Sequence, residues 1–414
     1  MRSTSFGIVL TLGLCLASCS GGGGGNGTAN SQGEKAMTFQ EDVEFLKKHV
    51  ETIVLTDGSG PAVAVVPDYQ CRVMTSAFSS DQPGIGWINY DLVASGEKQP
   101  HINVYGGEDR LWLGPEGGQF AIFFKKGDPF TLEAWQTPAV IDTEPFDVVT
   151  TTQISVACTK TASLVNYSGT RFDFRLDRTV RFLSPGSVDT ILGVTIPEGV
   201  KVVAYETENT ITNIGKQPWT KEGGLLSIWI LGMYKHSPTT TVVIPFREGP
   251  DEELGAVVND EYFGKVPADR LKVVGNLILF KADGHYRSKI GVPPERALPI
   301  IGSYDPAREL LTIVSYSLPR GASDYVNSMW EIQDDPFGGD VVNSYNDGPP
   351  EPGKPPLGPF YELETSSPAA ALEPNRSLTH MHQTFHFTGS KEALQSIAQE
   401  LLGADLDQVA GAFK

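Results

Sequence analysis

Two glutamates near the end of the chain, Glu362 and Glu364, have a spacing suited to acid/base chemistry. They lie two residues apart on a predicted strand, so their side chains share one face, with Cα atoms about 6.6–7 Å apart. When a neighbour or burial raises the pKa of one carboxyl group, that group can act as an acid while its partner acts as a base. Sugar hydrolysis uses such pairs. The alternative is two exposed glutamates on a strand surface.

Three histidines close to the C-terminus, His380, His382 and His386, share one face of another predicted strand. His380 and His386 are about 20 Å apart along a strand, which is too far for one ion whose ligands lie near 2.1 Å. Of the three, only His380 and His382 could share a metal. We interpret the face as one that contacts ligand hydroxyls, with plain surface as the alternative. No cofactor is expected, and a divalent cation has no support beyond this pair.

A glycine-rich segment gathers charged and aromatic residues. Glu108, Asp109, Arg110 and Glu116 stand beside Trp112, between Gly-Gly pairs that permit tight turns and close approach of a ligand. Carboxylates and an arginine can hold hydroxyl groups through directional, charge-assisted bonds. This pattern indicates a small-ligand site, with a structural ion-pair cluster as the alternative. A phosphate loop is excluded, since no Gly-Lys-Ser/Thr follows.

Periodicity indicates which elements hold these residues. From Thr170 to Leu183, apolar residues alternate with Arg and Asp, as in a strand with one buried face. Thr38 and Glu41 form a capping box that predicts a helix to about His49, and helical spacing predicts another helix after Ser390. Further strands are predicted at Ala62–Val66, Gln119–Phe124, Thr151–Ala157, Val202–Ile211, Leu226–Leu231, Thr240–Phe246, Leu271–Phe280, Leu310–Leu318, Val326–Ile332, Phe360–Thr365 and Ser377–Phe387. Strands between terminal helices predict a mainly β, antiparallel sandwich.

The N-terminus predicts export. Arg2 precedes an apolar run, Phe6–Leu14, which is too short to span a bilayer and is typical of a secretory signal peptide. The ending Leu-Ala-Ser-Cys19 resembles a bacterial lipoprotein signal, which implies cleavage after residue 18, lipidation of Cys19 and a place in the cell envelope, on the periplasmic or the surface side. Ordinary secretion is the alternative. Residues 19–36 read as a Gly/Ser-rich lipid-anchored linker, and 37–414 as a single domain.

The composition limits which classes of ligand are expected. The chain has 40% hydrophobic residues, as globular proteins do, and a formal charge of −18. A strongly acidic body argues against nucleic acid and polyanionic ligands, and leaves neutral or cationic small ligands open. Cys71 and Cys158 could form a disulfide in an oxidising compartment or remain buried thiols. Nothing in the sequence indicates an oligomeric state.

Three segments resemble the galactose mutarotase-like superfamily. His101–Gln119 resembles its early Gly-Gly segment, Tyr205–Asn213 its central strand, and Leu363–Pro368 its closing Leu-Glu motif. The order is that of the superfamily and spans about residues 57–389. More narrowly, the chain looks like an uncharacterised lipoprotein family of polysaccharide-degrading bacteria within that fold. The resemblance implies a β-supersandwich that holds a carbohydrate on a concave face.

The resemblance also implies residue roles. Glu364 falls on the catalytic base, and Arg72 falls near the arginine that contacts the sugar. The first family histidine is replaced by Tyr105, and Ile214–Trp219, directly after the central strand, contains no histidine, so the family's general acid is missing. His285, His382 and Tyr105 are the candidate acids. The predicted substrate-binding residues are Arg72, His101, Asn103, Glu108, Asp109, Arg110, Trp112, Glu116, Glu362 and His380.

We therefore expect a cell-envelope lipoprotein that binds a carbohydrate and processes it by acid/base chemistry, as an epimerase, hydrolase or lyase. The rival interpretation is a non-catalytic glycan-binding lipoprotein that assists polysaccharide utilisation. Its partners are a carbohydrate and, through Cys19, a membrane; no nucleic acid is expected.

Overall fold

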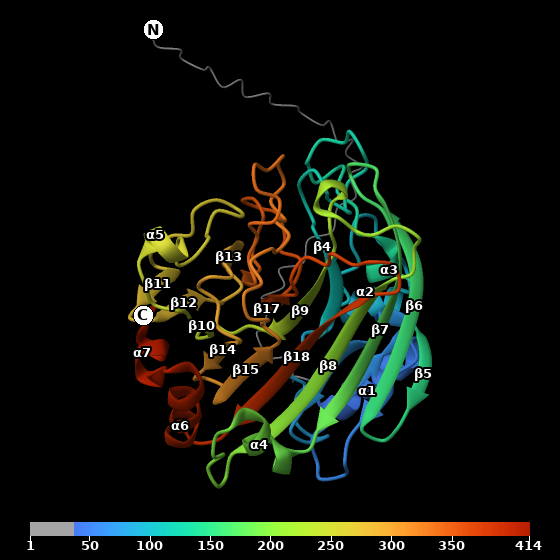
Figure 1. The fold of residues 1–414 in the computed structure, drawn as a ribbon. Helices are drawn as coiled ribbons and strands as arrows, with labels where there is room; N and C mark the ends of the chain where they lie inside the picture. Colours follow the sequence, from blue (N-terminus) through green and yellow to red (C-terminus); the bar gives the residue numbers. More distant parts are fainter. Residues whose placement is uncertain (1–36) are drawn as a thin grey trace, which may run out of the picture. The chain divides into compact units, whose positions relative to one another are not determined.

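The computed structural model describes residues 37–414 and is mainly antiparallel β-sheet (Figure 1). The predicted signal peptide, Cys19 and the linker lie outside the described residues. The first helix, α1 (Phe39–His49), begins at the predicted capping box: Thr38 accepts from the amide of Glu41, and the Glu41 side chain accepts from the amide of Thr38. Within residues 37–414, no helix has the length and apolar character needed to cross a membrane.

The larger sheet has ten strands in the order β11-β12-β10-β14-β15-β18-β8-β7-β6-β5. Each strand pairs antiparallel with its neighbours. In β7 every second residue is buried, as predicted for Thr170–Leu183. The strands are β5 (Asp147–Thr151), β6 (Ser155–Val165), β7 (Arg171–Leu183), β8 (Lys201–Asn213), β10 (Thr241–Pro245), β11 (Leu271–Val274), β12 (Leu277–Lys281), β14 (Ile300–Asp305), β15 (Leu310–Tyr316) and β18 (Ser377–Thr388).

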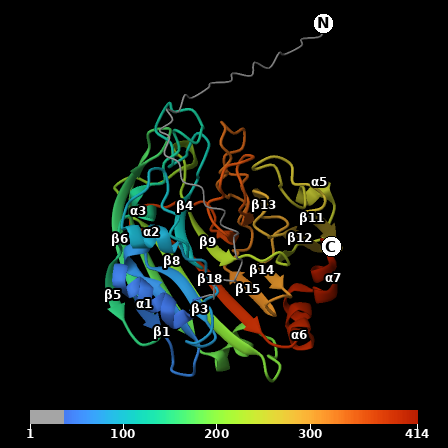
Figure 2. The same cartoon turned by 180° about the vertical axis from the view of Figure 1, so that it is seen from behind.

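A second sheet of five strands, in the order β13-β16-β17-β9-β4, positions the glutamate pair. Its strands are β4 (Arg110–Gly114), β9 (Ser227–Lys235), β13 (Ser288–Val292), β16 (Val342–Asn346) and β17 (Phe360–Ser366). A third sheet joins β1 (Ile53–Leu55), β2 (Ala62–Val66) and β3 (Arg72–Ala77). Figure 2 shows α1 from behind, where it contacts β3.

Short helices connect or cover the sheets. At the C-terminus, α6 (Lys391–Leu402) and α7 (Leu406–Gly411) pack on β10 and β14 through a separate apolar cluster that includes Leu394, Ile397 and Leu406. Ser390 caps α6 at its first turn, as helical spacing predicts. The others are α2 (Tyr90–Ser95), α3 (Ala139–Asp142), α4 (Val188–Leu192) and α5 (Asp251–Leu254), with 3₁₀ turns at Pro67–Tyr69, Pro185–Ser187 and Lys221–Gly223.

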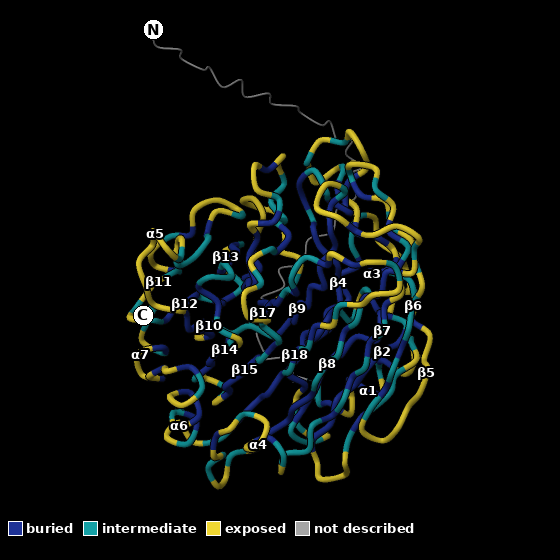
Figure 3. Tube along the Cα trace, viewed as in Figure 1, coloured by how far each residue is buried: buried dark blue, intermediate teal, exposed yellow. Residues whose placement is uncertain are grey.

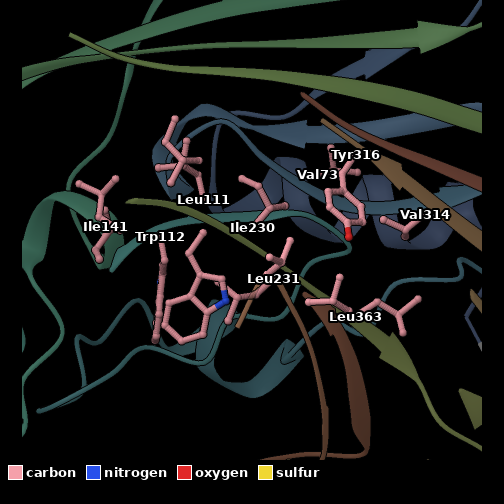
Figure 4. Close-up of a cluster of buried hydrophobic side chains, with 14 of the residues drawn as sticks. Val73, Leu111, Trp112, Ile141, Ile230, Leu231, Val314, Tyr316 and Leu363 are labelled. Carbon is pink, nitrogen blue, oxygen red and sulfur yellow. The ribbon is translucent and has the colours of Figure 1, made fainter. Parts of the chain in front are cut away.

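The main core lies between the five-stranded and ten-stranded sheets. Buried apolar side chains from both sheets join one cluster, and Figure 4 shows part of it, including Leu111 on β4, Ile230 on β9, Val314 on β15 and Leu363 on β17. The interiors of the sheets are buried, whereas connecting loops are exposed (Figure 3). Full burial of one such side chain contributes roughly 1.5–3 kcal/mol.

The mainly β, antiparallel prediction is confirmed, but two predicted strands are absent and a third, Thr151–Ala157, spans the turn between β5 and β6. Gln119–Phe124 and Val326–Ile332 are turns and loops, although both are apolar. Their side chains instead cover one face of the five-stranded sheet: Phe123 packs on Trp112, and Trp330 on Trp135. Leu271–Phe280 is a hairpin of β11 and β12, because Gly275 takes a left-handed conformation that breaks the run.

Candidate functional site

β17 places Glu362 and Glu364 on one face of the five-stranded sheet, as their spacing predicts. The intervening Leu363 and the following Thr365 point the other way, toward β18. We call the first face the carboxylate face; it carries Arg110, Trp112, Trp229, Lys289, Glu362 and Glu364. All six side chains are buried or nearly so.

Glu364 is held by two donors on one oxygen. Lys289 Nζ lies 2.8 Å from Glu364 Oε2, and Trp229 Nε1 donates to the same oxygen at 2.9 Å. The ammonium of Lys289 also lies 4.6 Å from the centre of the Trp229 ring, which is a cation–π contact. The other oxygen, Oε1, is buried and has no partner among the described residues. Glu364 is therefore fixed in position, with one acceptor atom unused.

Glu362 is paired with Arg110, whose Nη2 lies 2.8 Å from Glu362 Oε1. The guanidinium stacks over Trp112, 4.2 Å from the ring centre. Burial raises the pKa of Glu362 to about 8; the charge of Arg110 opposes this rise, and that of Glu364 adds to it. Near neutral pH burial therefore favours the protonated form of Glu362, while the guanidinium of Arg110 favours the ionised form.

Two more carboxyl groups border this face. Burial raises the pKa of Glu116, an effect that Lys289 opposes and the charge of Glu364 increases. Burial raises the pKa of Asp340 to about 6, against hydrogen bonds from Tyr262 and Asn259. These donors reach Asp340 Oδ2 at 2.5 and 3.1 Å. Burial thus favours the protonated forms of Glu116 and Asp340, both of which interact with Lys289.

Buried polar atoms of the carboxylate face that have no partner among the described residues include Glu364 Oε1, Arg110 Nε and Trp112 Nε1. Most buried polar atoms in folded proteins are hydrogen-bonded, so such a group calls for an explanation. One acceptor and two donors suit a ligand with hydroxyl groups, because a hydroxyl both donates and accepts. Tryptophan rings beside them offer apolar surface for a sugar ring.

A second polar network lies on the other side of the five-stranded sheet, inside the core. Glu108 accepts from Ser76 and Gly86 and lies 3.1 Å from His386 Nε2. Although burial acts to raise it, the bonds from His386 and Ser76 hold the pKa of Glu108 below its usual value. Asp109 pairs with Arg178 at 2.6 Å in the same network.

His380 and His382 belong to this inner network. Both hydrogen-bond to the hydroxyl of Thr365, at 2.9 Å each. Burial lowers the pKa of His380 to about 3 and that of His382 to about 4. Because Thr365 and Glu364 are adjacent on a strand, they point to opposite faces. The structure therefore separates His382 from Glu364, and neither histidine lies on plain surface.

The residues of the early Gly-Gly segment also lie in separate parts of the fold: Tyr105 is under α1, whereas Arg110 is on the carboxylate face. Tyr105 stacks on Tyr69 at 3.9 Å in a cluster under α1, and Arg72 lies against both rings. Gly107 allows this: a Cβ there would lie 2.6 Å from Arg72 Cδ, and its φ is +111°. Arg72 donates to the carbonyl of Gly106 at 2.8 Å. The structure thus brings Arg72 and Tyr105 together, away from the contacts of Glu364.

His101 and Asn103 have local partners. His101 Nδ1 lies 2.6 Å from the carbonyl of Trp135, and Asn103 donates to Asp142 at 2.8 Å. His285 is exposed in the turn before β13, and its recorded ring contact is His236. Of the three candidate acids, none lies in contact with Glu364. The carboxyl group that shares its face is Glu362.

Lys289, Trp229, Asp340 and Arg178 were missed by sequence reasoning. Lys289 sits in a short strand, Ser288–Val292, that the sequence analysis left unassigned, so it carried no signal. Trp229 lies in a predicted strand, where a tryptophan is ordinarily core. Arg178 occupies the apolar face of β7, and its place on that face was a signal for a buried partner.

The described residues contain no cluster suited to a metal ion. Within residues 37–414, no group of three or more His, Cys, Asp or Glu side chains is arranged to hold an ion. His380 and His382 instead share a threonine hydroxyl.

Similar solved structures include members of the superfamily that the sequence motifs resemble. The Slr1438 protein of Synechocystis sp. PCC 6803 is 14% identical, with 82% of this chain and 96% of that chain covered and a TM-score of 0.48. A putative aldose 1-epimerase from Escherichia coli K12 is 11% identical, with 81% and 98% covered and a TM-score of 0.45. A galactose mutarotase-like protein from Lactobacillus casei ATCC 334 is 12% identical, with 81% and 100% covered and a TM-score of 0.45.

No curated protein matches the chain. One family model matches, described as a family of unknown function, DUF6786, and it covers residues 37–413. The match takes in every strand and both sides of the five-stranded sheet. The chain therefore belongs to the DUF6786 family.

Proposed function

We propose that the chain binds a carbohydrate on the carboxylate face and transfers protons on it, with Glu364 as base and Glu362 as acid. The observation that carries this proposal is the pair itself: two buried carboxyl groups on one strand face, one ion-paired with Lys289 and the other with its pKa raised to about 8. Acid/base catalysis needs two groups that hold different protonation states at the working pH.

The free oxygen of Glu364 suits the role of base. Oε1 has no partner among the described residues, while Oε2 is anchored by Lys289 and Trp229. A sugar hydroxyl that donates to Oε1 can pass its proton there, and Glu362 can return one to a ring or bridging oxygen. Anomeric exchange, glycoside hydrolysis and elimination all require such transfers, so the pair alone does not select among them.

Aromatic residues beside the pair support a sugar rather than a fully polar ligand. Trp112 and Trp229 meet edge to face at 5.7 Å, and Trp135 stacks on Trp330 at 5.9 Å. Glu364 is fully buried, so a ligand reaches Oε1 only when the covering residues move. Trp330 packs on Trp135 and belongs to the loop between β15 and β16, and we propose that this loop moves to admit the ligand.

The second candidate function is non-catalytic glycan binding. The observation that favours it is that a cation holds each carboxyl group: Lys289 lies 2.8 Å from Glu364, and Arg110 lies 2.8 Å from Glu362. A binding protein would use these pairs to orient hydroxyl groups and would keep its affinity without a base. In either case we propose that Cys19 tethers the body to a membrane of the bacterial envelope through lipid.

A time course of one-dimensional proton NMR tests the proposal. The soluble body, residues 37–414, is mixed with a panel of mono-, oligo- and polysaccharides, since anomer exchange, bond cleavage and elimination each give distinct signals. We expect signals that change with time and stop changing in Glu364→Gln, which keeps an acceptor for Lys289 and Trp229. Glu362→Gln should also stop the change.

The matched control is Glu208→Gln on the outward side of β8, where the side chain is 40% exposed. It should leave the rate unchanged, because it removes one carboxylate of equal charge far from β17. Spectra that stay fixed with every sugar, with line broadening for some, would favour the binding protein. Turnover that persists in Glu364→Gln would refute the assignment of the base.

A further inference from the structure

A surface hollow of about 400 Å³ lies next to the carboxylate face. Its wall is formed by the end of α5 with the loop after it, the turn at Pro293–Glu295, and Gly338–Asp340. Three of its lining residues are acidic, Glu253, Glu295 and Asp340, and none is basic. Any ligand that enters here meets negative charge first.

Asp340 joins this hollow to the proposed proton-transfer pair. Its Oδ2 accepts from Tyr262, whose ring lies 5.5 Å from the ammonium of Lys289, the partner of Glu364. Gly291 on β13 makes room for the carboxyl group, since a Cβ at that position would lie 2.0 Å from Asp340 Oδ2. The glycine that lets Asp340 lie against β13 is therefore two residues from Lys289 on the same strand.

The cations of the carboxylate face are already engaged. Lys289 pairs with Glu364 and Arg110 with Glu362, and Glu116 and Asp340 add two more carboxyl groups. A carboxylate or sulfate on the ligand would accept from the unpartnered donors of this face, but it would add a negative charge beside the carboxyl groups without a cation of its own, and burying such a charge is costly. A hydroxyl or ammonium group on the ligand avoids this cost, because it can donate to Glu364 Oε1, an acceptor that has no partner among the described residues.

One arginine near this face stands outside the ion pairs. Arg287 donates to Tyr345 Oη at 3.2 Å and stacks on Phe263. Asp347 accepts from the same tyrosine at 2.7 Å, so the positive charge of Arg287 faces another carboxyl group. Arg287 is the residue that an anionic ligand would contact. A variant of Arg287 therefore tests whether an anionic sugar binds here.

We propose that the saccharide enters past Asp340 and is uncharged or amine-bearing, and that uronic acid and sulfated sugars are rejected. This inference rests on the proposed function, since it concerns the ligand of the same face. Hydroxyl and ammonium groups supply donors for the acidic residues of the hollow and for Glu364 Oε1, whereas an anionic group adds like charge beside the three acidic residues of the hollow.

The experiment is calorimetric titration of the body with three oligosaccharide sets of matched length: neutral, glucosamine-based and uronate-based. We expect neutral and amine-bearing sugars to bind, and uronates to bind at least about tenfold more weakly. Asp340→Asn keeps the acceptor for Tyr262 but removes the charge, so it should weaken amine-bearing sugars more than neutral ones. Asp189→Asn, exposed on α4, is the control of equal charge change.

The outcomes separate the two proposals. Uronates that bind as tightly as neutral sugars, with the affinity lost in Arg287→Gln, would overturn the inference and leave the proposed function standing. An unchanged ratio of amine-bearing to neutral affinity in Asp340→Asn would overturn the path past Asp340. If no saccharide of any set binds, the proposed function fails, and this inference fails with it.

Discussion

Lys289 and Glu364 form a buried ion pair between two strands that are not neighbours, with Nζ and Oε2 2.8 Å apart. β16 lies between their strands, so both side chains reach over it on the carboxylate face. The glutamate side chain is fully buried and the lysine side chain is 10% exposed. Removing one member of such a pair leaves an uncompensated charge, which costs roughly 3–5 kcal/mol.

Lys289→Met should therefore lower the free energy of unfolding by about 3–5 kcal/mol. The double variant Lys289→Met with Glu364→Leu should lose less stability than Lys289→Met alone, because no buried charge remains. Chemical denaturation of the single and double variants measures this coupling. A double variant whose loss equals the sum of both single losses would show that the two residues do not interact.

Glu362 should make stability fall as pH rises. Its pKa is raised to about 8 in the folded chain, so between the ordinary glutamate value near 4.3 and pH 8 the folded state holds a proton that the unfolded state has released. More protons bound in the folded state mean that the free energy of unfolding decreases with pH. The loss begins near the unfolded value and is complete above the folded one.

Glu362→Gln removes this titration. Relative to the variant, the parent chain should lose stability steadily between about pH 5 and 8, as measured by denaturant unfolding at several pH values. A parent and variant whose stabilities run parallel across that range would show that Glu362 titrates normally. Arg110→Met should raise the pKa of Glu362 further, because loss of the guanidinium removes the charge that opposes the rise.

The inner histidines should have the opposite effect at lower pH. Burial lowers the pKa of His380 to about 3 and of His382 to about 4, below the ordinary histidine value near 6.5. The unfolded state then binds more protons, so their contribution is fully present above about pH 6.5 and is lost as pH falls through the folded values. Unfolding between pH 7 and 4.5 should show this decline.

His382→Gln, which keeps a hydrogen-bonding group beside Thr365, should reduce the loss of stability as pH falls below about 6.5. Its stability at pH 7 will be lower, so the comparison is of slopes and not of absolute values. Proton NMR of the parent gives an independent reading, because both imidazoles should remain neutral at pH 5. An imidazole that titrates near pH 6.5 would contradict the burial of these side chains.

The sequence and the structure agree where local pattern decides. The capping box at Thr38, the alternation in β7 and the shared face of Glu362 and Glu364 all depend on residues close in sequence. The two false strands are apolar for another reason, since Phe123 packs on Trp112 of β4 and Trp330 packs on Trp135 of a neighbouring loop. Local periodicity cannot tell a covering loop from a buried strand.

The site was predicted in part. Arg110, Trp112, Glu362 and Glu364 share one face, but pairing across 252 residues between Arg110 and Glu362 has no local signal. Glu108, Asp109 and His380 lie in the core network. Glu108 and Asp109 bond to partners on β18 and β8, which are distant in sequence and give no local signal. His380 bonds to Thr365 on β17. Lys289 became recognisable only through its contact with Glu364.

The cysteines give a further prediction. Cys71 and Cys158 are free and buried, and burial, followed by the neighbouring Cys158 thiol, raises the pKa of Cys71 well above its usual value. A thiol reagent should therefore modify neither residue in the native body at pH 8 and both after unfolding. Mass spectrometry of the alkylated protein reports the count. A disulfide in the purified protein would contradict the free thiols.

Lipidation of Cys19 is the last prediction, and it follows from the sequence, since residues 1–36 lie outside the described part. The full chain expressed in a bacterium should incorporate a labelled fatty acid and sediment with membranes. Cys19→Ser should abolish labelling and release the chain, because one acidic body has little attraction for an anionic membrane surface. Cys15→Ser, four residues earlier in the predicted signal, is the matched control and should keep the label. Loss of label in the control as well, or retention in Cys19→Ser, would contradict the assignment.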